Sequence, residues 1–236
     1  MASTTTINGY LISTLDFGDF DQIITFLSEE GNLYPCLSKG SRKLESKNRS
    51  QLRIGNFCQF EVFLARHKDK MSRLKKCKAI NEADWRLGFF QPFNLLVESI
   101  QNSNFKNKAL YNYFVYIYEL LKTEKYSEKE LILITLEKFC LLNGISLEVN
   151  KCVECGTTKQ IHTLSLKKHG FVCHLHFDKK TDYEFSVKEC KLFHHLFNEQ
   201  YDELKNFSKY FDFIIKILKQ YIKDNLGVNF STLNNY

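Results

Sequence analysis

Residues 9–43 read GYLISTLDFGDFDQIITFLSEEGNLYPCLSKGSRK and contain three apolar runs with turn residues between them. Gly18 and Gly31 stand in the two intervening segments, where tight turns favour glycine. Each run has the length and composition of a short strand: Tyr10–Leu15, Ile23–Ser28 and Leu33–Leu37. The stretch therefore predicts three consecutive β-strands.

Two later segments alternate apolar and polar residues, as half-buried strands do: Phe57–Leu64 and Ser72–Ile80. A long connection separates the third predicted strand from the fourth. Five short strands with one long connection fit a small closed or partly open β-barrel. We therefore predict a five-stranded OB-fold barrel over residues 1–80.

Helical spacing replaces this pattern after residue 80. Apolar residues recur on helical faces in five segments: 89–103, 108–122, 128–143, 186–201 and 205–226. The aromatic residues at 111–118 are expected to lie in the core rather than to form a stacking surface. The polar tail after residue 229 is expected to fray. The predicted class is α+β multidomain, with an α-helical domain over residues 81–236 that contains a small zinc-finger-like knuckle at residues 150–180.

Positive charge is concentrated in one part of the chain. Residues 1–38 contain five acids and no Lys or Arg, whereas residues 39–78 contain thirteen Lys and Arg against three acids. Such a cluster repels itself unless a polyanion shares it, so it predicts nucleic-acid binding by the barrel domain. The alternative is a solvated charged loop. The predicted DNA-binding residues are Lys39, Arg42, Lys43, Lys47, Arg49, Arg66, Lys68 and Arg73.

The eight cysteines are expected to be thiols or metal ligands rather than a disulfide framework, because the first residues do not resemble a secretory signal. No run of about eighteen apolar residues occurs, so no membrane-spanning helix is expected. We therefore expect a cytoplasmic, nucleoid-associated protein that does not engage a membrane.

Four residues have the spacing of a zinc ribbon, C-x2-C-x17-C-x2-H: Cys152, Cys155, Cys173 and His176. Two residues between the ligands of each pair allow both donors to point at one metal ion. Four protein ligands would close the coordination sphere, so the predicted cofactor is a structural Zn²⁺. His174, His169 and Cys190 compete for the fourth position, and reduced thiols without metal are the alternative.

Two motifs together resemble the RecO family of bacterial recombination mediators. The family's N-terminal signature is matched by Gly18, Asp19, Asp21, Gly31, Lys39, Gly40 and Arg42. Downstream, residues 136–156, LEKFCLLNGISLEVNKCVECG, are similar to the family's helix that leads into a CxxCG knuckle. The second knuckle departs from the family pattern, because His169-Gly170 and Cys173-x2-His176 stand where a Gly pair and C-x2-C are usual.

The resemblance implies a non-enzymatic DNA repair and recombination protein. Members of this family bind single- and double-stranded DNA, anneal complementary strands, and act with RecR to load recombinase on strands coated by single-strand-binding protein. The resemblance further implies contact between the helical domain and the C-terminal tail of single-strand-binding protein. By position, Lys138 is the candidate for this contact, and a plain helix-surface lysine is the alternative.

Two other functions compete with this hypothesis. A nuclease or polymerase needs clustered carboxylates, but Asp16, Asp19 and Asp21 lie at a predicted turn, which explains them better. A protein-interaction scaffold would use the zinc knuckle for docking, with only incidental DNA binding.

Overall fold

The computed structural model describes residues 4–65, 70–84 and 90–236. The chain divides into two compact units, Met1–Val115 and Tyr116–Tyr236. The division lies inside the helix α2 (Lys108–Lys122), so this helix contributes to both units. The predicted domain boundary at residues 80–81 lies where the last barrel strand ends, ahead of the first helix. As a boundary between domains it stays a prediction.

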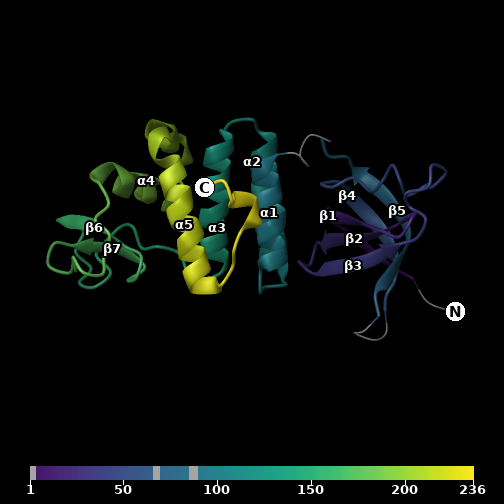
Figure 1. Ribbon diagram of the computed structural model, residues 1–236, viewed down its shortest axis with the longest axis horizontal. Coiled ribbons are helices and arrows are strands. Elements are labelled where there is room, and N and C mark those ends of the chain that lie inside the picture. The colour runs from purple at the N-terminus through teal and green to yellow at the C-terminus, as the bar shows by residue number, and fades with distance from the viewer. Residues whose placement is uncertain (1–3, 66–69, 85–89) are drawn as a thin grey trace. The chain divides into compact units, whose positions relative to one another are not determined.

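Five strands of the first unit close into a barrel in the order β1-β2-β3-β5-β4 (Figure 1). All neighbours are antiparallel except β3 and β5, which run parallel and pair only at Cys36–Ser72 and Leu37–Arg73. This architecture confirms the predicted five-stranded, OB-like barrel. The strands are β1 (Thr5–Phe17), β2 (Asp21–Ser28), β3 (Leu33–Ser38), β4 (Phe57–Phe63) and β5 (Ser72–Asn81).

Alternation along the strands fills the barrel. On β4, Cys58, Phe60 and Val62 are fully buried, whereas Gln59 between them is exposed. The Phe60 ring stacks on Phe26 from β2, with 4.0 Å between ring centroids. Removing a buried ring of this size costs about 3–5 kcal/mol, so this pair is central to the stability of the barrel.

Five α-helices follow the barrel within the described residues. The helices α3 and α4 begin with capping boxes, at Ser127 with Glu130 and at Ser186 with Glu189. The predicted last helix, 205–226, starts too early: a 3-10 helix, η2 (Tyr201–Tyr210), precedes α5, and Phe207 inside it has non-helical backbone angles. Besides α2, the α-helices are α1 (Gln91–Asn102), α3 (Glu128–Leu142), α4 (Val187–Phe197) and α5 (Phe211–Leu226).

The helix α3 lies at the centre of the second unit, where it packs against α4, α5 and η2. It is buried on almost every side, from Glu130 to Glu137 and at Phe139 and Cys140. The C-terminal tail packs on it, because Phe230 is fully buried and its ring lies 5.3 Å from that of Phe139. The prediction of a frayed tail was therefore wrong. A second 3-10 helix, η3 (Ser231–Leu233), ends the chain's regular structure.

Candidate nucleic-acid interface and metal centre

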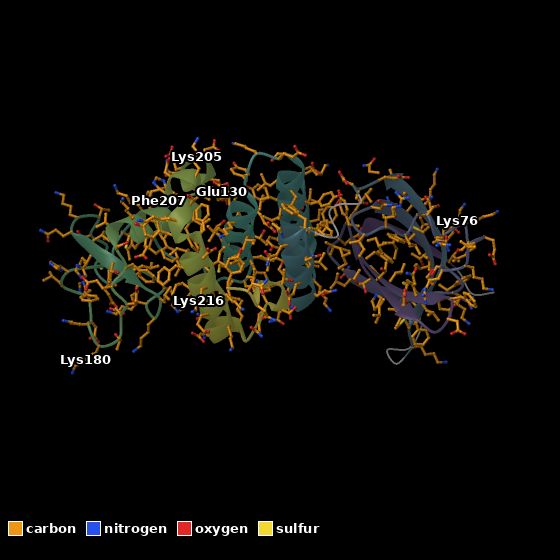
Figure 2. The ribbon with its side chains drawn as sticks, turned by 45° about the horizontal axis from the view of Figure 1, so that its top comes forward. Lys76, Glu130, Lys180, Lys205, Phe207 and Lys216 are labelled. Atoms are coloured by element: carbon orange, nitrogen blue, oxygen red, sulfur yellow. The ribbon has the colours of Figure 1, made fainter. Side chains whose placement is uncertain are left out.

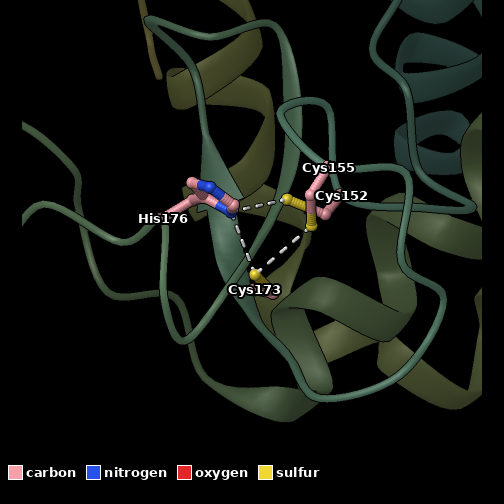
Figure 3. Close-up of side chains that lie close together, drawn as sticks. All are labelled: Cys152, Cys155, Cys173 and His176. Carbon is pink, nitrogen blue, oxygen red and sulfur yellow. Dashed lines mark hydrogen bonds between the residues drawn. The ribbon is translucent and has the colours of Figure 1, made fainter.

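Four potential metal ligands converge between α3 and α4. The ligand atoms of Cys152, Cys155, Cys173 and His176 all lie within 4.8 Å of one another (Figure 3). The Cys155 and Cys173 sulfurs are 3.9 Å apart, and His176 Nδ1 lies 3.2 Å from Cys173 Sγ and 3.7 Å from Cys152 Sγ. Tetrahedral zinc with Zn–S bonds of about 2.3 Å places neighbouring sulfurs about 3.8 Å apart. The four donors thus fit a zinc ion.

Backbone turns shape the first ligand pair. The Gly156 N–H donates to the Cys152 carbonyl at 2.8 Å, and Gly156 has a φ of +72°, which glycine adopts without strain. The Cys152 N–H in turn donates to the Thr157 carbonyl at 2.8 Å. This knuckle points both sulfurs toward the same space.

A short hairpin carries the second ligand pair to the first. Its strands are β6 (Ile161–Ser165) and β7 (Gly170–Cys173), which ends at a ligand. On β7, the Phe171 N–H donates to the Glu148 carbonyl, and the Phe171 carbonyl accepts from the Val153 N–H. Glu148 precedes Cys152 in the sequence and Val153 follows it, so β7 is bound on both sides of this ligand. Gly170 permits this approach, because a Cβ there would lie 2.5 Å from the Glu148 oxygen. The hairpin therefore sets the distance between the two ligand pairs.

The cluster shifts two of its three thiols toward the thiolate: the pKa values of Cys152 and Cys173 are lowered, whereas burial and the neighbouring thiols raise that of Cys155. Burial alone would raise the pKa of Cys152, but backbone N–H groups of Cys155, Cys173 and Glu154 outweigh it and lower the pKa to about 6. Hydrogen bonds with Cys173 and Cys152 raise the pKa of His176. Thiolates are the form that binds metal, so the lowered pKa values of Cys152 and Cys173 agree with the spacing of the donors.

The three competing ligands have other neighbours. His169 Nδ1 lies 2.7 Å from the Tyr221 hydroxyl, and the His174 ring packs 4.5 Å from that of His162. Cys190 contacts the Phe185 carbonyl. Within the described ranges, the structure therefore groups Cys3His without them, and the four residues remain the predicted zinc ligands.

The basic connection between β3 and β4 is folded onto the barrel. Leu52 joins the barrel core, and successive backbone turns run from Gly40 to Asn56. Two amide side chains bind the edge of β5: Asn48 Oδ1 accepts from the Cys77 N–H at 2.9 Å, and Gln51 Oε1 accepts from the Ala79 N–H at 2.8 Å. The pairing of β3 with β5 ends at Leu37–Arg73, and beyond it these two side chains bind the N–H groups of β5.

Arg42 holds the turn between β1 and β2. Its guanidinium is 3.2 Å from the Asp16 carboxylate and donates to the Gly18 and Asp19 carbonyls, each at 3.2 Å. Its backbone N–H donates to the Phe20 carbonyl at 3.0 Å. The charge of this predicted DNA-binding residue is therefore balanced by an acid of the opening segment.

The other predicted cations differ in their surroundings. Lys39, Lys43, Lys47 and Arg49 are exposed and have no carboxylate partner among the residues that the structure describes. The Arg73 guanidinium lies over the Phe63 ring, 5.0 Å from its centroid. Arg66 and Lys68 lie outside the described residues.

Two cations absent from the sequence-based set lie beside the connection. Lys76 and Lys78 flank the buried Cys77 on β5, so their side chains leave the outer face of the barrel, as Figure 2 shows for Lys76. Because Asn48 binds Cys77, these two lysines lie along the same edge as the residues beside Asn48. We call this set the cationic strip: Lys47, Arg49, Lys76 and Lys78. Alternating lysines within a predicted strand were the signal for the missed pair.

Lys138 is largely enclosed in the second unit. Its side chain is only 10% exposed, forms a close ion pair with Glu199, and lies 3.6 Å from the Glu137 carboxylate. Its ammonium group also lies over the Tyr116 and Tyr201 rings, 5.5 and 5.9 Å from their centroids. Lys138 is therefore not the plain surface lysine that was the alternative, and its charge is already balanced.

Every helix within residues 4–65, 70–84 and 90–236 is too short or too polar to cross a lipid bilayer.

Comparisons with known proteins cover both units. The family model described as "Recombination protein O N terminal" matches residues 1–83, and the one described as "Recombination protein O C terminal" matches residues 91–233. Two relatives named DNA repair protein RecO match most of the chain. The one from Mesoplasma florum is 23% identical over 235 residues, 94% of this chain and 86% of that protein. The one from Acetivibrio thermocellus is 23% identical over 240 residues, 96% of this chain and 94% of that protein.

A shorter match comes from the protein of the same name in Mycoplasma mycoides, which is 24% identical over 160 residues, 64% of this chain. The match spans 63% of the length of that relative and likewise 63% of the Mycoplasma capricolum relative.

Proposed function

The chain belongs to the Recombination protein O (RecO) family, and we propose that it serves DNA repair and recombination by binding single- and double-stranded DNA on its barrel. Family membership supports the repair and recombination role. The observation that carries the proposed DNA contact is the cationic strip, four exposed cations on β5 and on the connection beside it. Lys39 and Lys43 extend this positive surface toward the turn between β1 and β2.

The proposed mechanism is electrostatic. Lys and Arg side chains that contact phosphates release condensed counterions, which drives binding without reading base sequence. Two complementary strands bound to one positive surface repel each other less than they do in solution, so pairing is faster. Strand annealing by this route needs no covalent bond to form or break.

A salt titration tests the DNA contact. Four phosphate contacts predict that the logarithm of the binding constant falls with a slope of about −3 against the logarithm of salt concentration. Replacing Lys76 and Lys78 with Gln should reduce the magnitude of this slope by about 1.5, since each lost contact removes roughly 0.7–0.9. Lys122→Gln and Lys129→Gln together provide a matched control in the second unit. An affinity independent of salt would reject the proposal.

We further propose RecR and the C-terminal tail of single-strand-binding protein as partners, with recombinase loading as the outcome. Lys138 is the proposed contact for the tail. An acidic tail must displace Glu199 to reach this ammonium group, which the Tyr116 and Tyr201 rings would continue to flank. Lys138→Ala should then abolish binding of a tail peptide, with Lys129→Ala as the control. Equal peptide affinity in both variants would exclude Lys138.

We also propose that Cys152, Cys155, Cys173 and His176 hold a structural Zn²⁺. The metal would cross-link the two knuckles and stabilise the β6–β7 hairpin against the segment that follows α3.

A further inference from the structure

The turn between β1 and β2 exposes two aromatic side chains. Phe17 and Phe20 are each 53% exposed, and no strand or helix covers them in the described part of the first unit. Gly18 between them has a φ of +59°, so the turn reverses tightly and keeps both rings at its tip. Exposed apolar residues are ordinary when isolated, whereas adjacent exposed rings bounded by cations indicate a binding surface.

The aromatic turn is fixed to the basic connection. Arg42 binds the turn through its backbone and its guanidinium, as described above. On the other side, the Gly40 N–H donates to the Asp21 carboxylate at 2.7 Å. The rings and the neighbouring cations are therefore presented by one preorganised surface, which lowers the entropy lost on binding.

Phe20 lines two surface hollows that are also lined by cations. One hollow of about 410 Å³ is lined by Phe20, Arg42, Arg49 and Leu52. The other, of about 540 Å³, is lined by Phe17, Phe20, Lys39 and Lys43. The Lys43 ammonium lies 5.4 Å from the centroid of the Phe20 ring. Each hollow thus combines an aromatic ring with at least one cation that has no carboxylate partner among the described residues.

An aromatic face beside a free cation matches one nucleotide of a single strand, which presents a flat base and a phosphate. The bases of a duplex are already stacked on their neighbours and are inaccessible to such rings. We propose that Phe17 and Phe20 stack unpaired bases of single-stranded DNA, while Lys39, Lys43 and Arg49 contact its phosphates. This inference rests on the proposed function and adds a distinction between single and double strands.

Two acids oppose this arrangement. Asp21 lines the second hollow, where its carboxylate accepts from the Gly40 N–H, and Asp19 lines both hollows without a paired cation among the described residues. A carboxylate beside a phosphate path repels it, so Asp19→Asn should raise the affinity for single-stranded DNA by about fivefold at low salt. An unchanged affinity would show that the phosphates do not pass these hollows.

The main test measures anisotropy of a labelled oligothymidine and of a blunt duplex of equal length. Phe20→Ala should weaken oligothymidine binding about tenfold, equivalent to ~1.4 kcal/mol, with little change for the duplex. The salt slope should stay that of the wild type, because no charge is removed. Phe20→Tyr should retain the affinity, since its ring can still stack.

Phe105→Ala is the matched control. Phe105 is 44% exposed in the same unit. Three residues later in the sequence, the Lys108 ammonium donates to the carbonyl of Glu29, which follows the end of β2 that is remote from Phe20. If the wild type binds DNA and Phe20→Ala binds oligothymidine equally well, or loses single and double strands alike, the stacking inference is wrong while DNA binding stands. If the wild type binds neither oligonucleotide, the proposed function fails and this inference with it.

Discussion

At the scale of single residues, the structure separates cations that hold the fold from cations that remain available. Arg42 and Lys138 both matched the expectation of a binding residue by position, yet each is paired with acids. Lys43 and Arg49, close to Arg42 in sequence, have no such partner among the described residues. Charge density along the chain therefore identifies a cationic segment but not which of its cations are left without an acidic partner.

Glu137 gives the clearest prediction at this scale. Burial raises the pKa of its carboxyl to about 7, although Lys138 and the Tyr201 hydroxyl act to lower it. The folded-state pKa lies above the ordinary value of 4.5, so the contribution of this carboxyl to stability is fully present below pH 4.5 and is lost as pH rises through about 7. Glu137→Gln keeps an acceptor for Tyr201 and removes the titration. In this variant, the free energy of unfolding should fall less as pH rises, with a difference from the wild type of up to about 3 kcal/mol at pH 8.

Thermal or urea unfolding of the second unit between pH 5 and 8 measures this effect. Glu128→Gln on the exposed first turn of α3 is the matched control and should follow the wild type. Identical pH profiles for Glu137→Gln and the wild type would contradict the assignment.

At the scale of elements, the connection between β3 and β4 acts as part of the barrel. β3 and β5 pair over only two residues, and amide side chains occupy the remaining edge of β5. Buried or half-buried N–H groups need partners, so this clamp both closes the barrel and positions Lys47 and Arg49.

Removing the clamp should therefore affect stability and binding together. Asn48→Ala leaves the Cys77 N–H without its acceptor, which should destabilise the barrel by about 1–3 kcal/mol. It also frees the connection, so DNA affinity should fall although no charge is lost. Urea unfolding and anisotropy test the two effects. Gln59→Ala, an exposed amide on β4, is the control and should change neither. Stable protein with unaltered affinity would disprove the role of the clamp.

At the scale of the whole molecule, the proposed DNA contact and the metal cluster belong to different compact units. The cationic strip lies in the first unit, and Cys152, Cys155, Cys173 and His176 all lie in the second. Each unit has its own buried core, so loss of metal should act locally.

Removal of zinc is predicted to loosen the knuckle and leave the barrel intact. The wild type should contain about one zinc per chain, and His176→Ala should lose it. Hydrogen exchange should then speed up in residues 150–180 but not in β1–β5, and strand annealing should persist. His174→Ala, in the same knuckle but outside the cluster, should keep its zinc. Zinc-free wild-type protein would contradict the metal site.

The presence of the five barrel strands and most helix limits follow from the sequence alone, because periodicity and turn residues are local properties. The start of β1 at Thr5 rather than Tyr10, and the strands β6 and β7, were not predicted. The helix 108–122 occurs as predicted, and α3 ends one residue before the predicted limit. The spacing of the two knuckles likewise anticipated the Cys3His cluster, since each knuckle is a short-range turn. The break at Phe207 and the buried tail were missed, because both depend on packing against distant elements.

Only the tertiary structure decided which charges remain free, how the basic connection folds, and which rings stand exposed. An ion pair such as Arg42 with Asp16 joins the basic connection to β1 and leaves no local pattern. The same is true of Asn48 on Cys77, which brings Lys76 and Lys78 beside the connection. Sequence determines what each segment can form, whereas long-range contacts select which of its polar groups are left for a ligand.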